Sequence, residues 1–173
     1  MYPIINYPYS SKLNDRLYDT IIQNLAPGES QNDNAVGRRT VWNLHKQNIR
    51  DVDLLTTWIK NIIPTKSVLI PLTGEDIFNF NPHNFEMTHC WGLVYDKGHS
   101  MAAHNHFPFS LSFVYGVKMP RGSSPLIIGN KKINLKEGQC VFFPSHIMHR
   151  VPYNSSERRC VVAGNLMYEF KDM

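Results

Sequence analysis

The sequence predicts an α+β, mainly β domain, organised as a jelly-roll barrel with packing helices before it. The prediction depends on three observations, two of them on the pattern of apolar residues. Apolar residues follow a helical 3-4 spacing in segments before residue 82, whereas from about residue 83 short apolar strands alternate with turns. A third observation is size, because 173 residues, 42% of them hydrophobic, are enough for one domain with its own core. We therefore expect a helical support region over 1–82 and the barrel over 83–173.

Two segments of the support region are expected to be helices, 10–26 and 51–63. Both have one apolar face, and the first ends at the loop-forming sequence PGESQNDN. In the second, Asp51 is placed to cap the start and Pro64 to end the helix. Their expected role is to pack against the barrel.

The strands of the barrel are expected in a regular series. Each segment is rich in β-branched and aromatic residues and is bounded by turn residues, and the third reads as two short strands around Gly129-Asn130. The segments are 85–95, 104–120, 125–135, 138–145 and 149–170.

Composition and charge give no support to several classes of protein. The net charge is +4, and the basic residues occur in separated pairs, so there is no strong nucleic-acid signal. The three cysteines form no C-x-x-C motif, which indicates a reducing compartment rather than a disulfide framework. No signal peptide and no apolar run of transmembrane length occurs, so we expect a cytoplasmic protein without a membrane partner. Oligomeric state is not predicted.

Histidines carry the functional signal. His104 and His106 stand at i and i+2, which on a strand places both side chains on one face. His149 follows about 40 residues later, after an apolar strand and a proline, and His146 lies three residues before it. A third ligand from a later strand would complete a facial set on one side of a metal ion, with open positions for substrate and oxygen.

Two blocks of sequence resemble a known enzyme family. KGHSMAAHNHFPFSLSFVYGVKMP and EGQCVFFPSHIMHRVPYNSSERRCVVAGNL are similar to the motif blocks of 2-oxoglutarate–Fe(II) oxygenases related to prolyl hydroxylases, over about 84–168. The resemblance implies a double-stranded β-helix, Fe(II) as the metal (which Zn or Ni can replace on purification), 2-oxoglutarate as co-substrate, and hydroxylation as the reaction. It also implies that His104 and His149 bind iron and that Arg159 pairs with the far carboxylate of 2-oxoglutarate.

The physical chemistry of an arginine suits that carboxylate. Guanidinium offers a bidentate fork to a carboxylate, and Arg158 would point to the opposite face of the strand. Tyr115 and Asn165 are further candidates for hydrogen bonds to the co-substrate. Three other side chains are expected to line the pocket: Trp91, Tyr95 and His146.

The resemblance has one departure. Most enzymes of this chemistry use H-x-D or H-x-E, but this chain has no acidic residue between Asp96 and Glu137. Either His106 is the third ligand, or water or an anion fills that position. Three neutral imidazoles leave the full charge of the metal in place, which a dianionic co-substrate would neutralise. Imidazole also suits Zn, Cu and Ni, so the ligands alone do not select iron.

Two alternative functions use the same residues. The spacing Gly98, His104 and His106, followed by Gly138, Pro144 and His149, resembles the two motifs of cupins, which have a similar barrel and commonly a three-histidine site. A cupin would be a dioxygenase, an isomerase or a small-molecule binder that needs no 2-oxoglutarate. The second alternative is a non-catalytic jelly-roll module. The substrate is not identified beyond a small molecule or a peptide.

Overall fold

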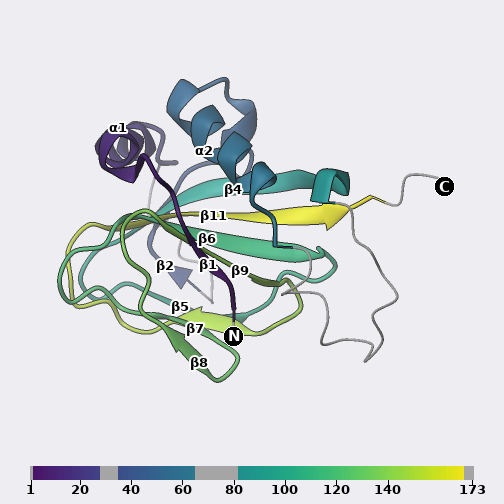
Figure 1. Ribbon diagram of the computed structural model, residues 1–173. Coiled ribbons are helices and arrows are strands. Elements are labelled where there is room, and N and C mark those ends of the chain that lie inside the picture. The colour runs from purple at the N-terminus through teal and green to yellow at the C-terminus, as the bar shows by residue number, and fades with distance from the viewer. Residues whose placement is uncertain (1, 28–34, 65–81, 170–173) are drawn as a thin grey trace.

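The protein is built in three layers, two helices and two antiparallel sheets, in a computed structural model that describes residues 2–27, 35–64 and 82–169 (Figure 1). The larger sheet has six strands in the order β1 (Ile4–Asn6), β9 (Gln139–Pro144), β6 (Leu111–Lys118), β11 (Arg159–Tyr168), β4 (Phe85–Tyr95) and β3 (Arg38–Arg39). The smaller sheet has five, in the order β2 (Ala35–Val36), β5 (Ser100–His104), β10 (His149–Val151), β7 (Leu126–Ile128) and β8 (Lys131–Ile133). The mainly β, jelly-roll prediction is confirmed.

The helices lie on the face of the larger sheet that points away from the smaller one (Figure 1). They are α1 (Ser10–Gln23) and α2 (Arg50–Asn61), with short 3₁₀ turns at Leu44–Lys46 and Pro82–Asn84. The 3-4 spacing that predicted each helix corresponds to its buried face, which in α1 consists of Leu13, Asn14, Leu17 and Ile21. No helix in the described ranges is long and apolar enough to cross a membrane.

The sequence indicated that Asp51 caps α2, but the structure does not show this cap. The helix begins one residue earlier, after Ile49, and no side chain caps it. Asp51 lies in the first turn, where its carboxylate accepts a 3.0 Å hydrogen bond from Arg16 of α1. The acidic side chain thus links the two helices and also lies at the end of α2 where negative charge is favourable.

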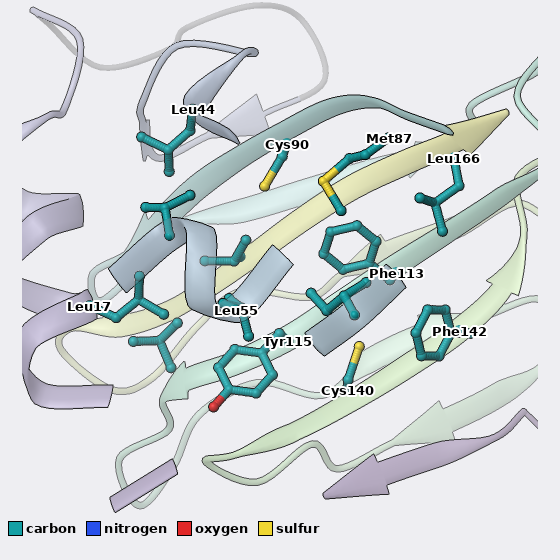
Figure 2. Close-up of a cluster of buried hydrophobic side chains, with 14 of the residues drawn as sticks. Leu17, Leu44, Leu55, Met87, Cys90, Phe113, Tyr115, Cys140, Phe142 and Leu166 are labelled. Atoms are coloured by element: carbon teal, nitrogen blue, oxygen red, sulfur yellow. The ribbon is translucent and has the colours of Figure 1, made fainter. Parts of the chain in front are cut away.

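The larger sheet separates two hydrophobic cores because its side chains alternate between its faces. Along β6, Phe113, Tyr115 and Val117 face the helices, whereas Val114 faces the smaller sheet. Figure 2 shows the helix-side core, where residues of α1 and α2 meet those of β4, β6, β9 and β11. The labelled members are Leu17, Leu44, Leu55, Met87, Cys90, Phe113, Tyr115, Cys140, Phe142 and Leu166.

Two expectations about strands are corrected. The support region is not purely helical, because β1 and β3 extend the larger sheet and β2 extends the smaller one. The segment expected as one strand over 104–120 is also divided: β5 ends at His104, and β6 begins only at Leu111. His106 therefore lies in the connection between the two sheets, and its side chain is not placed by strand alternation.

Candidate metal centre

Three histidines meet at one end of the space between the sheets. His104 is the last residue of β5 and His149 the first of β10, and the two are directly paired across the smaller sheet. His106 reaches them from the loop after β5. The nearest ligand-capable atoms of the three side chains all lie within 4.8 Å of one another. Nitrogen–metal bonds of about 2.1 Å place two ligand atoms at most about 4.2 Å apart, so small side-chain rotations bring all three onto one ion.

Hydrogen bonds prepare two of these imidazoles for ligation. Nδ1 of His104 lies 2.9 Å from the carbonyl oxygen of Ala102, and Nδ1 of His149 lies 3.0 Å from that of Ile147. A carbonyl only accepts, so Nδ1 carries the proton in each ring and donates it. The lone pair is then on Nε2, and the tautomer is fixed in the manner typical of metal-binding histidines.

The pocket also keeps imidazoles neutral, which is the form that binds a metal. Burial lowers the pKa of His106 to about 3, with smaller contributions from His149 and His104. Burial, followed by the effect of His104, lowers the pKa of His149 to about 4. At neutral pH His106 and His149 therefore offer uncharged nitrogen donors.

His106 is held by its backbone and by an aromatic neighbour. Its amide N–H donates a 2.8 Å hydrogen bond to the carbonyl oxygen of Ser145, at the end of β9. Its ring meets the Trp91 indole edge-on, with centroids 5.7 Å apart. The side chain is thus directed toward His104 and His149 although it lies outside any strand.

The histidines open onto a cavity of about 180 Å³ between the two sheets. Most of its lining is apolar, including Leu93, Leu126 and Val151. Arg159 lies in the same cavity and is 1% exposed. A buried guanidinium in an apolar pocket requires a reason, because burial of an unpaired charge is costly.

Arg159 is only partly satisfied by the chain. Its Nε donates to the carbonyl oxygen of Ser124 at 3.1 Å, and its Cζ lies 4.8 Å from the centre of the Tyr95 ring. Its Nη1 is buried and has no hydrogen-bond partner among the described residues. Burial lowers the pKa of Arg159, while Tyr95 acts in the opposite direction. The unpaired donor fits an anion bound in the cavity, since a carboxylate would satisfy it.

Arg158 has a different environment from Arg159. It is exposed, has a positive φ of 60° just before β11, and its backbone N–H donates to the Asp96 carboxylate at 3.1 Å. Of this pair, only Arg159 is among the residues that line the cavity.

Tyr115 does not line the cavity, and its expected contact with the co-substrate is corrected. β6 directs its side chain into the helix-side core, where the hydroxyl donates a 2.7 Å hydrogen bond to Oδ1 of Asn14 in α1. Val114, the preceding residue, faces the cavity instead. The sequence placed Tyr115 on a strand but did not show which face of the sheet was the pocket side.

Asn165 is connected to the site through a serine. Its Oδ1 accepts a 2.9 Å hydrogen bond from Oγ of Ser112, and Ser112 lines the cavity. Because that proton is used, the 2.8 Å contact between Ser112 and Ser145 is donated by Ser145. Asn165 thus orients a serine of the cavity wall and does not itself line the cavity.

Of the three side chains that were expected to line the pocket, two do so and one does not. Trp91 and Tyr95 line the cavity, whereas His146 is exposed and does not. The cavity residues that had not been singled out from the sequence include Arg39, Trp42 and Ser112. The pair Arg38-Arg39 was visible, but nothing in the sequence indicated that β3 adds it to the edge of the barrel.

Comparisons with known proteins agree with this description. No family model and no curated protein matches the sequence. Three solved structures cover 95–96% of the chain. A viral collagen prolyl hydroxylase from Paramecium Bursaria Chlorella virus-1, in a 2-oxoglutarate complex, has a TM-score of 0.69 at 13% identity over 94% of its own chain. A Trichoplax adhaerens prolyl hydroxylase, in complex with a hypoxia-inducible-factor peptide fragment, scores 0.63 at 15% identity over 82% of its chain.

The third structure carries a different activity. It is SnoN, a non-haem α-ketoglutarate-dependent epimerase from nogalamycin biosynthesis, with a TM-score of 0.70 at 11% identity over 76% of its chain. At such identities the likeness shows the fold. The protein therefore has the double-stranded β-helix fold found in 2-oxoglutarate–Fe(II) oxygenases, which confirms the resemblance in sequence at the level of fold.

Proposed function

We propose that the protein is a 2-oxoglutarate- and Fe(II)-dependent oxygenase that hydroxylates a small-molecule or peptide substrate. The observation that carries the proposal is one cavity with a three-histidine cluster and a buried arginine that has an unpaired donor. A metal ion suits the three histidines, and a carboxylate suits the unpaired donor of the arginine. 2-Oxoglutarate needs both, because it chelates a metal at one end and has a free carboxylate at the other.

The roles of the residues follow from their positions. His104 and His149 would hold the metal through Nε2, with His106 as the third ligand, and Arg159 would bind the C5 carboxylate. When bound, iron and 2-oxoglutarate with O₂ supply the oxidation that converts a C–H bond to C–OH, while the co-substrate becomes succinate and CO₂.

The chain itself positions and shields these partners. Tyr95 and Ser124 hold the guanidinium of Arg159 in one place through the ring contact and the Nε hydrogen bond. Leu93, Leu126 and Val151 exclude water from the cavity wall, which strengthens electrostatic interactions inside. The pocket is therefore ordered before any ligand binds.

Calorimetry with 2-oxoglutarate under oxygen-free conditions tests this proposal. We expect the iron-loaded protein to bind 2-oxoglutarate, and on exposure to oxygen to release succinate slowly even without its prime substrate. Arg159→Ala should weaken the binding at least about 30-fold, because removing one partner of a buried charge pair commonly costs about 2–5 kcal/mol. Circular dichroism would verify that the variant is folded.

Arg158→Ala is the matched control and should bind 2-oxoglutarate like the parent. Failure of the iron-loaded parent to bind 2-oxoglutarate at millimolar concentration would overturn the proposal. Stoichiometric metal binding without 2-oxoglutarate binding would favour the cupin alternative, and absence of both would favour the non-catalytic module.

A further inference from the structure

The cavity contains a second arginine, which has no acidic partner among residues 2–27, 35–64 and 82–169. β3 pairs with β4 so that Arg39 stands opposite Leu93, which faces the cavity, and Arg39 lines the cavity as well. Arg38 is directed elsewhere and forms a 2.7 Å ion pair with Asp96. Strand alternation thus gives two successive arginines different surroundings, one neutralised by a carboxylate and one directed inward.

Arg39 retains a free donor in its present contacts. Its Cζ lies 4.2 Å from the centre of the Trp42 ring, and its Nη1 donates to the carbonyl oxygen of Thr40 at 3.1 Å. Its Nε is buried and has no hydrogen-bond partner among the described residues. A buried donor without a partner is costly, and an anion in the cavity would remove that cost.

An aromatic wall leads from Arg39 to the histidines. The Trp42 ring meets the Trp91 ring with centroids 4.6 Å apart, and Trp91 meets His106 at 5.7 Å. Trp42 is 43% exposed, so its indole is accessible to a ligand as well as to Arg39. A bound molecule can therefore touch the guanidinium at one end, the two indoles along its length and the histidine cluster at the other end.

The charges of the cavity favour an anionic substrate. Arg39 and Arg159 are its two permanently charged lining residues, and none of the described lining residues is acidic. A dipositive metal and a dianionic co-substrate cancel, so both guanidinium charges would remain in excess. Since none of the described residues adds a carboxylate to the histidine cluster, an acid in the substrate position would reduce that excess.

We infer that Arg39, Trp42 and Trp91 form a substrate subsite for a small organic acid with an apolar, planar body. Its carboxylate pairs with Arg39, its body packs on the indoles, and the carbon to be oxidised points toward His106. The small cavity, about 180 Å³, favours a free acid over a polypeptide. The assignment of the oxidised carbon rests on the proposed function, whereas recognition of the acid does not.

Matched acids and amides test the subsite. The probes are phenylacetate and indole-3-acetate, each compared with its uncharged amide. Calorimetry would be run on metal-free protein and on Zn(II)-loaded protein saturated with 2-oxoglutarate, which occupies Arg159. We expect the acids to bind at least about 10-fold more tightly than the amides, and Arg39→Gln to remove that preference, as loss of a charge-assisted hydrogen bond costs about 1.5–3 kcal/mol.

Arg38→Gln is the control on the same strand and should keep the preference for acids. Both variants should bind 2-oxoglutarate within about twofold of the parent. Equal binding of acids and amides, or no binding of either acid at millimolar concentration, overturns the inference. So does an Arg39→Gln variant that loses 2-oxoglutarate instead of the acid, because Arg39 would then belong to the co-substrate site. Acid binding to a protein that never binds 2-oxoglutarate supports the subsite and rejects only the oxygenase.

Discussion

At the scale of single residues, the proposed function assigns to His106 the ligand position that H-x-D and H-x-E enzymes fill with a carboxylate. Its ring is directed at His104 and His149, and its ligand atom belongs to the same cluster. The cluster is composed of histidines alone, so the metal would receive no negative charge from these side chains.

The first prediction concerns the chemistry of that position. His106→Ala should lower metal affinity by at least about 10-fold, whereas His106→Asp should keep the metal and shift preference from Zn(II) toward Fe(II), since a carboxylate is a harder ligand than imidazole. Competition between the two metals, followed by elemental analysis, measures both effects. His146→Ala is the control because His146 is exposed and outside the cluster.

Metal binding by His106→Ala equal to that of the parent would show that His104 and His149 suffice, with water or an anion in the third position. Metal loss in His146→Ala would show that the cluster is not the site.

A second prediction concerns pH. Burial lowers the pKa of His106 to about 3 and of His149 to about 4, against about 6.5 in an unfolded chain. Between these values the unfolded state binds more protons than the folded state, so the free energy of unfolding rises with pH. The stability that these two neutral histidines contribute is complete above about pH 6.5 and is lost as the pH falls to about 4 for His149 and about 3 for His106. Metal-free protein should therefore have a lower urea midpoint at pH 5 than at pH 7.

His106→Gln supplies the control for this dependence, because glutamine does not titrate. The variant should lose less stability between pH 7 and pH 5 than the parent does. An identical loss in both proteins would mean that other groups cause the pH dependence.

At the scale of elements, α1 and β6 are joined by buried polar contacts. Asn14 donates through Nδ2 to the carbonyl oxygen of Val117 at 3.0 Å and accepts from the Tyr115 hydroxyl at 2.7 Å. Burial is the main reason that the pKa of Tyr115 is raised well above its ordinary value. The tyrosine thus remains a neutral donor that fixes where the helix lies on the sheet.

The third prediction tests that structural role. Tyr115→Phe removes the hydroxyl but keeps the ring, which leaves Oδ1 of Asn14 buried without its donor. We expect the free energy of unfolding to fall by about 1–3 kcal/mol, because an unsatisfied buried acceptor loses its hydrogen bond without regaining water. Urea denaturation measures the loss. Affinity for 2-oxoglutarate should not change, and a large drop in affinity at unchanged stability would place Tyr115 in the site after all.

The predictable elements are those with one consistent pattern over many residues. In α1 and α2 the buried positions recur at helical spacing, and in β4 and β11 an almost continuously buried run extends over 10 or more residues. Strands of two residues, such as β3, have no period and exist only because β4 offers an edge to pair with. The residues of the site follow a similar division: Arg159, at the start of β11, was predicted through the family resemblance over about 84–168, whereas Arg39 lies on β3, outside that range, and was not predicted.

His106 illustrates a different limit. The i, i+2 spacing correctly indicated that His104 and His106 lie together, but for the wrong reason, because β5 ends at His104. The hydrogen bond from the His106 amide to Ser145 brings the side chain back toward the cluster. A hydrogen bond between residues so far apart in the chain cannot be predicted from the local pattern of residue types.

At the scale of the whole molecule, the histidine cluster lies between the two sheets, which also pack against each other through the hydrophobic core between them. His104 and His149 belong to neighbouring strands of the smaller sheet, and His106 is attached through Ser145 to the end of β9 in the larger one. The helix-side core does not reach this region, since it lies across the larger sheet. A metal ion bound to the three histidines would therefore connect the two sheets.

The last prediction is that metal binding between the sheets raises the melting temperature. An ion that binds only the folded state stabilises it by about 2.7 kcal/mol at a concentration 100 times its dissociation constant. For a domain of this size, about 1 kcal/mol shifts the melting temperature by about 2–4 °C, so Zn(II) or Co(II) added to chelator-treated protein should raise it by about 5–10 °C. His149→Ala should abolish most of the rise, whereas His146→Ala should show all of it. Scanning calorimetry decides between these outcomes: an equal rise in His149→Ala would place the stabilising ion elsewhere, and no rise in the parent would mean that the three histidines do not hold a metal between the sheets.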